Sequence, residues 1–188
     1  MAQIVARHVR LKTGEDATLR SPEPRDARPL IGYMADVLAN SPYMIRTPAE
    51  HTTTVRREKA WIRRQNALAD ELIVVAEQAG HIVGMLDTST EKRRRLRHST
   101  AFGLSVHPGW RQRGLGRALV ATLVDWAVSN PRLERIELHV HSGNQPAIAL
   151  YESMGFREQG RRPGAIKYED GRYMDDVLMW RPATHAKG

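Results

Sequence analysis

A short basic segment with two closely spaced glycines carries the clearest chemistry in this chain. It reads Leu104-Ser105-Val106-His107-Pro108-Gly109-Trp110-Arg111-Gln112-Arg113-Gly114-Leu115-Gly116-Arg117. Strand-forming residues come first, a basic turn follows, and helical periodicity begins at the glycines. Backbone N–H groups at a helix N-terminus have no partner within the helix and bind phosphate readily. Gly114 and Gly116 let an anion approach the backbone, and Arg111, Arg113 and Arg117 add positive charge. The segment therefore predicts an anion-binding turn.

Several other kinds of site are excluded by the residues that are missing. Gly109 and Gly114 have the spacing of a P-loop, but no Lys-Ser/Thr pair follows them, and no third glycine completes a dinucleotide fingerprint. The chain contains no cysteine, which excludes disulfides, cysteine-based metal sites and a cysteine nucleophile. His139 and His141 alternate on one predicted strand without an evident third ligand, so no metal is expected.

The charge of the chain is concentrated in one region. The 188 residues include 29 basic and 21 acidic side chains, a formal charge of +8. Residues 91–117 hold eight of the basic side chains and a single acid, Glu91. Such a distribution indicates a local anion site or a basic hairpin. The charge falls in two clusters, Lys92–Arg97 and Arg111–Arg117.

The elements that must position this turn follow from periodicity and turn signals. Strands are predicted at 16–20, 71–78, 81–89, 99–106, 135–141, 165–168 and 172–180, and helices at 24–39, 55–68, 114–129 and 144–154. Short turns between the central strands favour antiparallel pairing. The sequence therefore predicts an α/β fold with a mixed, mostly antiparallel sheet of six to seven strands and helices on both faces.

The domain organisation expected from this pattern is simple. Residues 1–14 are predicted to be a flexible lead-in, 15–182 a single domain, and 183–188 a tail. The longest apolar runs are far shorter than a bilayer span, and no targeting segment is evident. A cytoplasmic protein without membrane contact is expected.

Two motifs in this order resemble one known family. The run Arg111–Gly116 resembles the Gln/Arg-x-x-Gly-x-Gly/Ala signature of the GNAT superfamily of N-acetyltransferases. About 30 residues later, the run Asn144–Phe156 resembles that family's N-x-x-A-x-x-L-Y-x-x-x-G-F helix. The order of elements from 16 to 180 also resembles the GNAT fold, so the resemblance covers nearly the whole chain.

The resemblance implies an enzyme that uses acetyl-CoA as co-substrate and acetylates a primary amine, that of a small molecule such as an amino acid. Since a cysteinyl intermediate is impossible here, direct transfer is favoured. One alternative is acetylation of a protein N-terminus, for example of a ribosomal protein. Alternatives of another class are a non-catalytic acyl-CoA sensor and an RNA- or ribosome-binding module, so contact with nucleic acid stays open. A homodimer is a further expectation.

The resemblance also implies roles for individual residues. The residues expected to bind the coenzyme are Leu104, Ser105, Val106, Arg111, Gln112, Arg113, Gly114, Leu115, Gly116, Arg117, Asn144, Ala147 and Tyr151. Tyr151 is the expected general acid, because a phenol stays protonated where a thiol does not. The general base is open between Asp87, His98, His139 and a water. The basic run Lys92–Arg97 has four open interpretations. It is a solvated turn, or it contacts an acidic acceptor, the 3′-phosphate of CoA, or RNA.

Overall fold

The computed structural model describes residues 3–184, which form two compact units. Unit 1 contains the chain up to Ser89 together with Gly103–Leu123, and unit 2 contains Thr90–Phe102 and the chain from Val124 onward. Strand β5 (Ser99–Val106) and helix α3 (Leu115–Ser129) contribute residues to both units. Each unit is described by itself.

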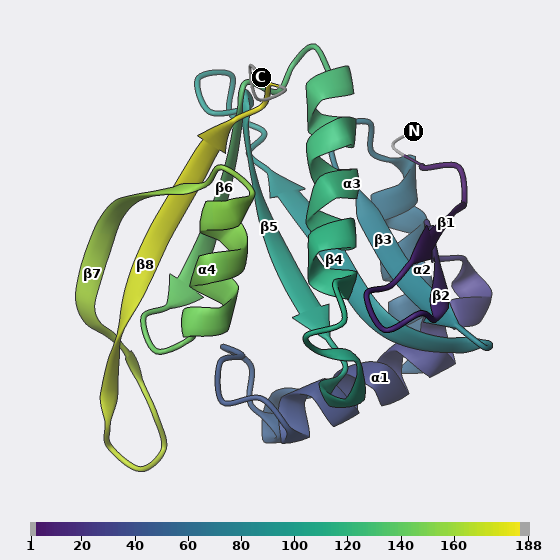
Figure 1. The fold of residues 1–188 in the computed structure, drawn as a ribbon, viewed down its shortest axis with the longest axis horizontal. Coiled ribbons are helices and arrows are strands. Elements are labelled where there is room, and N and C mark those ends of the chain that lie inside the picture. The colour runs from purple at the N-terminus through teal and green to yellow at the C-terminus, as the bar shows by residue number, and fades with distance from the viewer. Residues whose placement is uncertain (1–2, 185–188) are drawn as a thin grey trace. The chain divides into compact units, whose positions relative to one another are not determined.

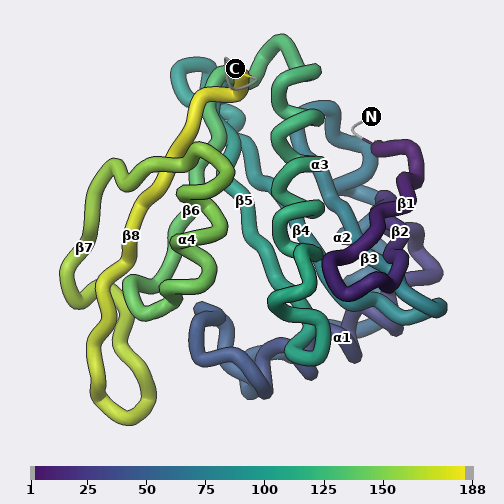
Figure 2. The backbone as a smooth tube through the Cα atoms, viewed as in Figure 1, coloured from purple at the N-terminus to yellow at the C-terminus, as the bar shows by residue number. Residues whose placement is uncertain are grey.

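Unit 1 is built on antiparallel strands that follow one another in chain order (Figure 1). They are β1 (Arg7–Arg10), β2 (Asp16–Arg20), β3 (Ile73–Gln78) and β4 (His81–Thr90). The second half of β5 lies next to β4. The path of the chain through β1 and β2, which fold back on each other, can be followed in Figure 2.

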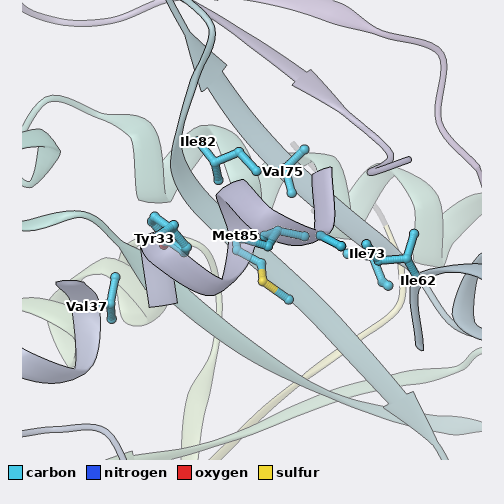
Figure 3. Close-up of a cluster of buried hydrophobic side chains, with 9 residues drawn as sticks. Tyr33, Val37, Ile62, Ile73, Val75, Ile82 and Met85 are labelled. Atoms are coloured by element: carbon cyan, nitrogen blue, oxygen red, sulfur yellow. The ribbon is translucent and has the colours of Figure 1, made fainter. Parts of the chain in front are cut away.

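Helices cover both faces of the unit 1 strands. On one face, α1 (Ala27–Ala39) and α2 (Val55–Ala67) pack on β3 and β4 through a buried apolar cluster (Figure 3). The cluster includes Tyr33, Val37, Ile62, Ile73, Val75, Ile82 and Met85. On the other face, Leu115 and Leu119 of α3 lie against Gly84, where a Cβ would be 3.2 and 3.1 Å from their side chains. A glycine at 84 thus lets α3 pack closely on the sheet.

Unit 2 continues from the first half of β5. This strand pairs in parallel with β6 (Arg135–His141), β8 (Tyr173–Pro182) pairs antiparallel with β6, and β7 (Arg157–Lys167) pairs with β8. Helix α4 (Gln145–Ser153) connects β6 and β7. Tyr151 of α4 packs edge-on against Phe102 of β5, with ring centroids 5.7 Å apart.

The predicted fold class is confirmed, with two differences in detail. The described residues contain eight strands rather than six to seven. The extra strand is β1, inside the predicted lead-in 1–14, of which residues 1 and 2 lie outside the described part. Strand β7 begins at Arg157 rather than at 165, because irregular register at Glu158/Gly160 and Arg162/Ile166 accommodates its glycines and proline.

The predicted single domain over 15–182 stays a prediction. Most of the predicted tail, 185–188, lies outside the described residues. Over residues 3–184, no helix has the length and apolar character needed to cross a lipid bilayer.

Candidate functional site

The glycine-bearing turn joins the end of β5 to the start of α3, as the sequence predicts. After Val106, the His107 N–H donates to the Val83 carbonyl at 3.0 Å, which fixes the strand end on β4. Two residues then adopt the left-handed region, Gln112 at φ 62° and Gly114 at φ 90°. The Ala118 N–H donates to the Gly114 carbonyl at 3.1 Å and begins the helical ladder. The amides of the first turn of α3 have no acceptor inside the helix, which suits an anion.

Arg111 and Arg113 of this turn contact other groups of the protein. The Arg111 guanidinium donates to the carbonyls of Val106 at 3.2 Å and Asn40 at 3.4 Å. The Arg113 guanidinium forms an ion pair with Glu15 at 2.5 Å and stacks over the Trp110 ring at 4.8 Å. Their charges stay at the turn, but Glu15 neutralises part of them.

A contact from the N-terminal strands to this turn has no signal in the sequence. The Lys12 N–H donates to the Arg113 carbonyl at 3.0 Å. A Cβ at position 114 would lie 3.3 Å from Lys12 Cγ. Gly114 is therefore required both by its positive φ and by the side chain that covers it.

The end of β5 is held by a buried tyrosine of α1. The Tyr33 hydroxyl lies 2.9 Å from the Ser105 hydroxyl, and Tyr33 is buried in the cluster of Figure 3. Burial raises the pKa of Tyr33, against the opposing effects of Ser105 and Arg111. Leu104, Ser105 and Val106 are partly exposed. Leu115, by contrast, is 1% exposed, so only its backbone can bind a ligand.

Asp87, one of the candidate bases, lies in unit 1 beside β5. A Cβ at Gly103 would be 3.4 Å from Asp87 Oδ1. Burial raises the pKa of Asp87 to about 6, repulsion from Glu71 adds to the rise, and Arg46 opposes it. A carboxyl group with this pKa can accept a proton near neutral pH.

Unit 2 contains Tyr151, the predicted general acid, at the end of α4. Its ring contacts Phe102 at 5.7 Å and Phe156 at 5.9 Å, and the residue is 7% exposed. Burial raises the pKa of Tyr151. The phenol therefore stays protonated, and full transfer of its proton to a thiolate of ordinary pKa is uphill. Tyr151 is better suited to donate a hydrogen bond than to give up its proton.

Asn144 and Ala147 lie at the start of the same helix. The Asn144 carbonyl accepts the N–H groups of Ala147 at 3.0 Å and Ile148 at 3.1 Å. Its side chain makes no capping hydrogen bond to the helix and is partly exposed. The carboxamide is thus placed to bind another group.

A histidine–carboxylate pair stands on β6 and β8. His139 Nδ1 lies 2.8 Å from Asp176 Oδ2, and Arg162 Nε donates to the same oxygen at 2.9 Å. Burial raises the pKa of Asp176, but hydrogen bonds from Arg162 and His139 outweigh burial and hold it below its usual range. The His139 side chain is 52% exposed, while that of Asp176 is 5% exposed. An ionised carboxylate therefore orients an accessible imidazole.

The strand pairing places His139 on the face of unit 2 opposite to α4. Phe102 contacts Tyr151, and Ala101 pairs with Glu137. Because side chains alternate along a strand, His139 shares the face of Glu137, not that of Phe102. His139 lies two residues beyond Glu137, which pairs with Ala101 of β5. His98 immediately precedes β5, whereas Val106 is the last of its eight residues, so the two lie at opposite ends of the strand.

The predicted site residues thus fall into two groups. Unit 1 brings together Leu104–Val106 and the turn Arg111–Arg117. Unit 2 holds Asn144, Ala147 and Tyr151. Within residues 3–184 there is no group of three or more side chains that could hold a metal ion. The run Lys92–Arg97 forms an exposed loop between β4 and β5 in which Arg93 lies 3.8 Å from Glu91.

Comparisons with known proteins give a consistent result. The model of the acetyltransferase (GNAT) family matches residues 37–156. The chain is 35% identical over 104 residues to the L-amino acid N-acetyltransferase AaaT of Escherichia coli K12, covering 54% of this chain and 62% of that protein. It is 38% identical over 89 residues to the ribosomal protein bS18-alanine N-acetyltransferase of the same organism, covering 47% and 59%. These matches span about three fifths of each relative.

A solved structure shares the fold. The structure of yncA from Salmonella typhimurium with its cofactor acetyl-CoA superposes with a TM-score of 0.79 at 20% identity. The match covers 92% of this chain and 96% of that one. At this identity the similarity concerns the fold.

Proposed function

Because this chain belongs to the acetyltransferase (GNAT) family, we propose that it transfers the acetyl group of acetyl-CoA directly to a primary amine of a small molecule such as an amino acid. The observation that carries the proposal is the turn between β5 and α3. Gln112 and Gly114 adopt left-handed backbone there, and the open first turn of α3 follows. This turn offers backbone donors and nearby positive charge to a pyrophosphate.

Residues of each unit are proposed to bind the coenzyme. The amides of Arg111–Gly116 would hold the pyrophosphate, with Arg117 exposed beside them. Leu104–Val106 would lie along the pantetheine arm as a neighbouring strand does. The Asn144 carboxamide, which does not cap α4, would donate to the arm, and Ala147 would pack beside it. When bound, acetyl-CoA supplies an acetyl thioester that a neutral amine can attack.

Protein groups would then stabilise the negative charge that develops on the carbonyl oxygen and on the sulfur, and accept a proton from the amine. The Val106 N–H would donate to the carbonyl oxygen as negative charge develops on it. Tyr151 would donate a hydrogen bond to the departing sulfur, and burial keeps its hydroxyl protonated. We propose His139 as the base, since Asp176 fixes its Nδ1 and leaves Nε2 to accept a proton from the amine. Asp87 is the second candidate, on its raised pKa.

The acceptor is proposed from the relatives. The similarity to AaaT supports a free amino acid, and the similarity to the bS18-alanine acetyltransferase supports the N-terminal alanine of a protein as the second candidate. Both acceptors present a primary amine on a carbon that is bonded to a carbonyl carbon. A homodimer and a cytoplasmic location are further parts of the proposal, and sedimentation of the purified protein would check the homodimer.

The deciding experiment measures thiol release from acetyl-CoA. The acceptors are free L-amino acids, their decarboxylated amines, and a short peptide that begins with alanine. Turnover with free amino acids supports the proposal, whereas turnover with the peptide alone supports the second candidate. Binding of CoA without thiol release for any acceptor would identify a sensor and refute the enzyme. Tyr173→Phe, which changes an exposed tyrosine, is the matched control for Tyr151→Phe.

A further inference from the structure

We propose that Lys12, in the turn between β1 and β2, binds a phosphate group of the coenzyme. The proposal rests on the proposed function, since it needs a coenzyme at the turn between β5 and α3. It extends the site to a segment outside the GNAT-like motifs. Lys12 lies before residue 37, where the family match begins.

The turn that carries Lys12 is closed by its own hydrogen bonds. The Leu11 N–H donates to the Glu15 carbonyl at 2.8 Å, and the Gly14 N–H donates to the Leu11 carbonyl at 3.0 Å. Leu11 is 5% exposed and anchors the turn in unit 1. Lys12 itself is exposed. The turn is thus a defined element that presents a lysine.

Three contacts attach this turn to the predicted phosphate site. The Lys12 N–H donates to the Arg113 carbonyl at 3.0 Å, and Glu15 pairs with Arg113 at 2.5 Å. The Lys12 stem runs past Gly114, since a Cβ there would meet Cγ, Cδ and Cε at 3.3, 3.8 and 3.9 Å. In Figure 1 the purple turn between β1 and β2 lies beside the N-terminal end of α3. The ammonium group, one bond beyond Cε, is therefore at the mouth of the turn.

The charge balance at the turn favours a role for this ammonium. Arg113 is paired with Glu15, and Arg111 donates to two backbone carbonyls. Over residues 3–184, Lys12 forms no ion pair with a carboxylate. An exposed ammonium held beside open helix amides is a phosphate ligand of the usual kind, a point charge on a flexible stem. Because the Lys12 stem packs on Gly114, its side chain loses less conformational entropy when the ammonium group binds a phosphate.

The test measures CoA binding by calorimetry at low ionic strength. Lys12→Met keeps the apolar stem and removes the charge. We expect it to weaken CoA binding about fivefold, the usual size of one exposed ion pair. Arg10→Met is the matched control, because Arg10 is exposed on the same segment but pairs with Asp16 at 3.0 Å. Circular dichroism and thermal unfolding check that both variants keep the fold.

Binding of a second ligand, 3′-dephospho-CoA, shows which phosphate group Lys12 contacts. If Lys12 binds the 3′-phosphate, the variant and the wild type bind 3′-dephospho-CoA equally. If Lys12 binds the pyrophosphate, the variant loses affinity for both ligands to the same degree. Equal binding of CoA by the folded variant and the wild type overturns the role of Lys12 while the proposed function stands. A wild-type protein that binds no CoA overturns both.

Discussion

Asp87→Asn tests the partly buried carboxyl group in unit 1 through the pH dependence of stability. Burial and Glu71 raise the pKa of Asp87 from 3.8 to about 6. A raised pKa means that the folded protein binds a proton more tightly than the unfolded chain does. Stability should therefore fall as pH rises from about 4 to about 6 and then stay at the lower level. Asparagine at position 87 has no carboxyl group to ionise, so this loss of stability should be absent from Asp87→Asn.

The magnitude follows from the shift. A shift of about two units corresponds to about 3 kcal/mol at about 1.4 kcal/mol per unit. Because Asp87 is only partly buried and its surroundings can relax, we expect about half of this, about 1.5 kcal/mol, in favour of Asp87→Asn at pH 7.5. At pH 3.5, where the wild-type carboxyl group is largely protonated in both states, the two proteins should differ by less than about 0.5 kcal/mol.

Urea unfolding at pH 3.5, 5, 6 and 7.5 measures the difference directly. With a slope of about 2 kcal/mol per molar urea, the midpoint at pH 7.5 should rise by about 0.7 M. Asp36→Asn, the same change at an exposed position on α1, is the matched control. A gain that is the same at every pH, or a loss of stability at pH 7.5, would refute the reasoning.

Three further changes test the two site groups. Gly114→Ala forces a side chain at φ 90° against Lys12 and should lower the free energy of unfolding in urea by about 1 to 2 kcal/mol. Gly160→Ala, with open space around it, should lower it by less than about 1 kcal/mol. Equal losses would contradict the requirement for glycine at 114. Tyr151→Phe should lower kcat about a hundredfold and leave CoA affinity unchanged, because the departing sulfur loses its hydrogen-bond donor. Unaltered turnover across the pH range would exclude this role of Tyr151. Asp176→Asn should lower kcat/KM for the amine about tenfold, because the His139 imidazole loses the carboxylate that orients it; an unchanged kcat/KM in the folded variant would argue against a positioning role.

The elements around the turn could be predicted because their signals are local. The strand at 99–106 and the strand at 135–141 are confirmed at both ends, and the helix from 55 is confirmed at its first residue. In the structure Thr54 caps this helix, because its hydroxyl accepts the Arg57 N–H at 3.3 Å. Apolar periodicity and cap residues decide these elements within a few neighbouring positions.

The missed elements depend on contacts between distant residues. Strand β1 has the sequence Arg-His-Val-Arg and is largely exposed, so no apolar alternation marks it, and only pairing with β2 makes it a strand. Lys12 reaches Arg113 across a hundred positions, and no spacing rule connects them. The His139–Asp176 pair likewise depends on how β6 and β8 align. The sequence predicts His139 only as one of several candidate bases, and the pairing of β6 with β8 brings Asp176 to it.

The bond between Lys12 and Arg113 has a consequence for the lifetime of the N-terminal segment. An edge strand of four residues with mostly exposed side chains belongs to the parts of a protein that open most easily. Opening the turn at Lys12 breaks its contact with Arg113, in the turn that we propose binds the coenzyme, so a coenzyme bound there would oppose the opening. At a hundred times the dissociation constant, binding adds about 2.7 kcal/mol against any opening that empties the site. The supply of coenzyme would thereby regulate how long residues 3–15 resist a protease.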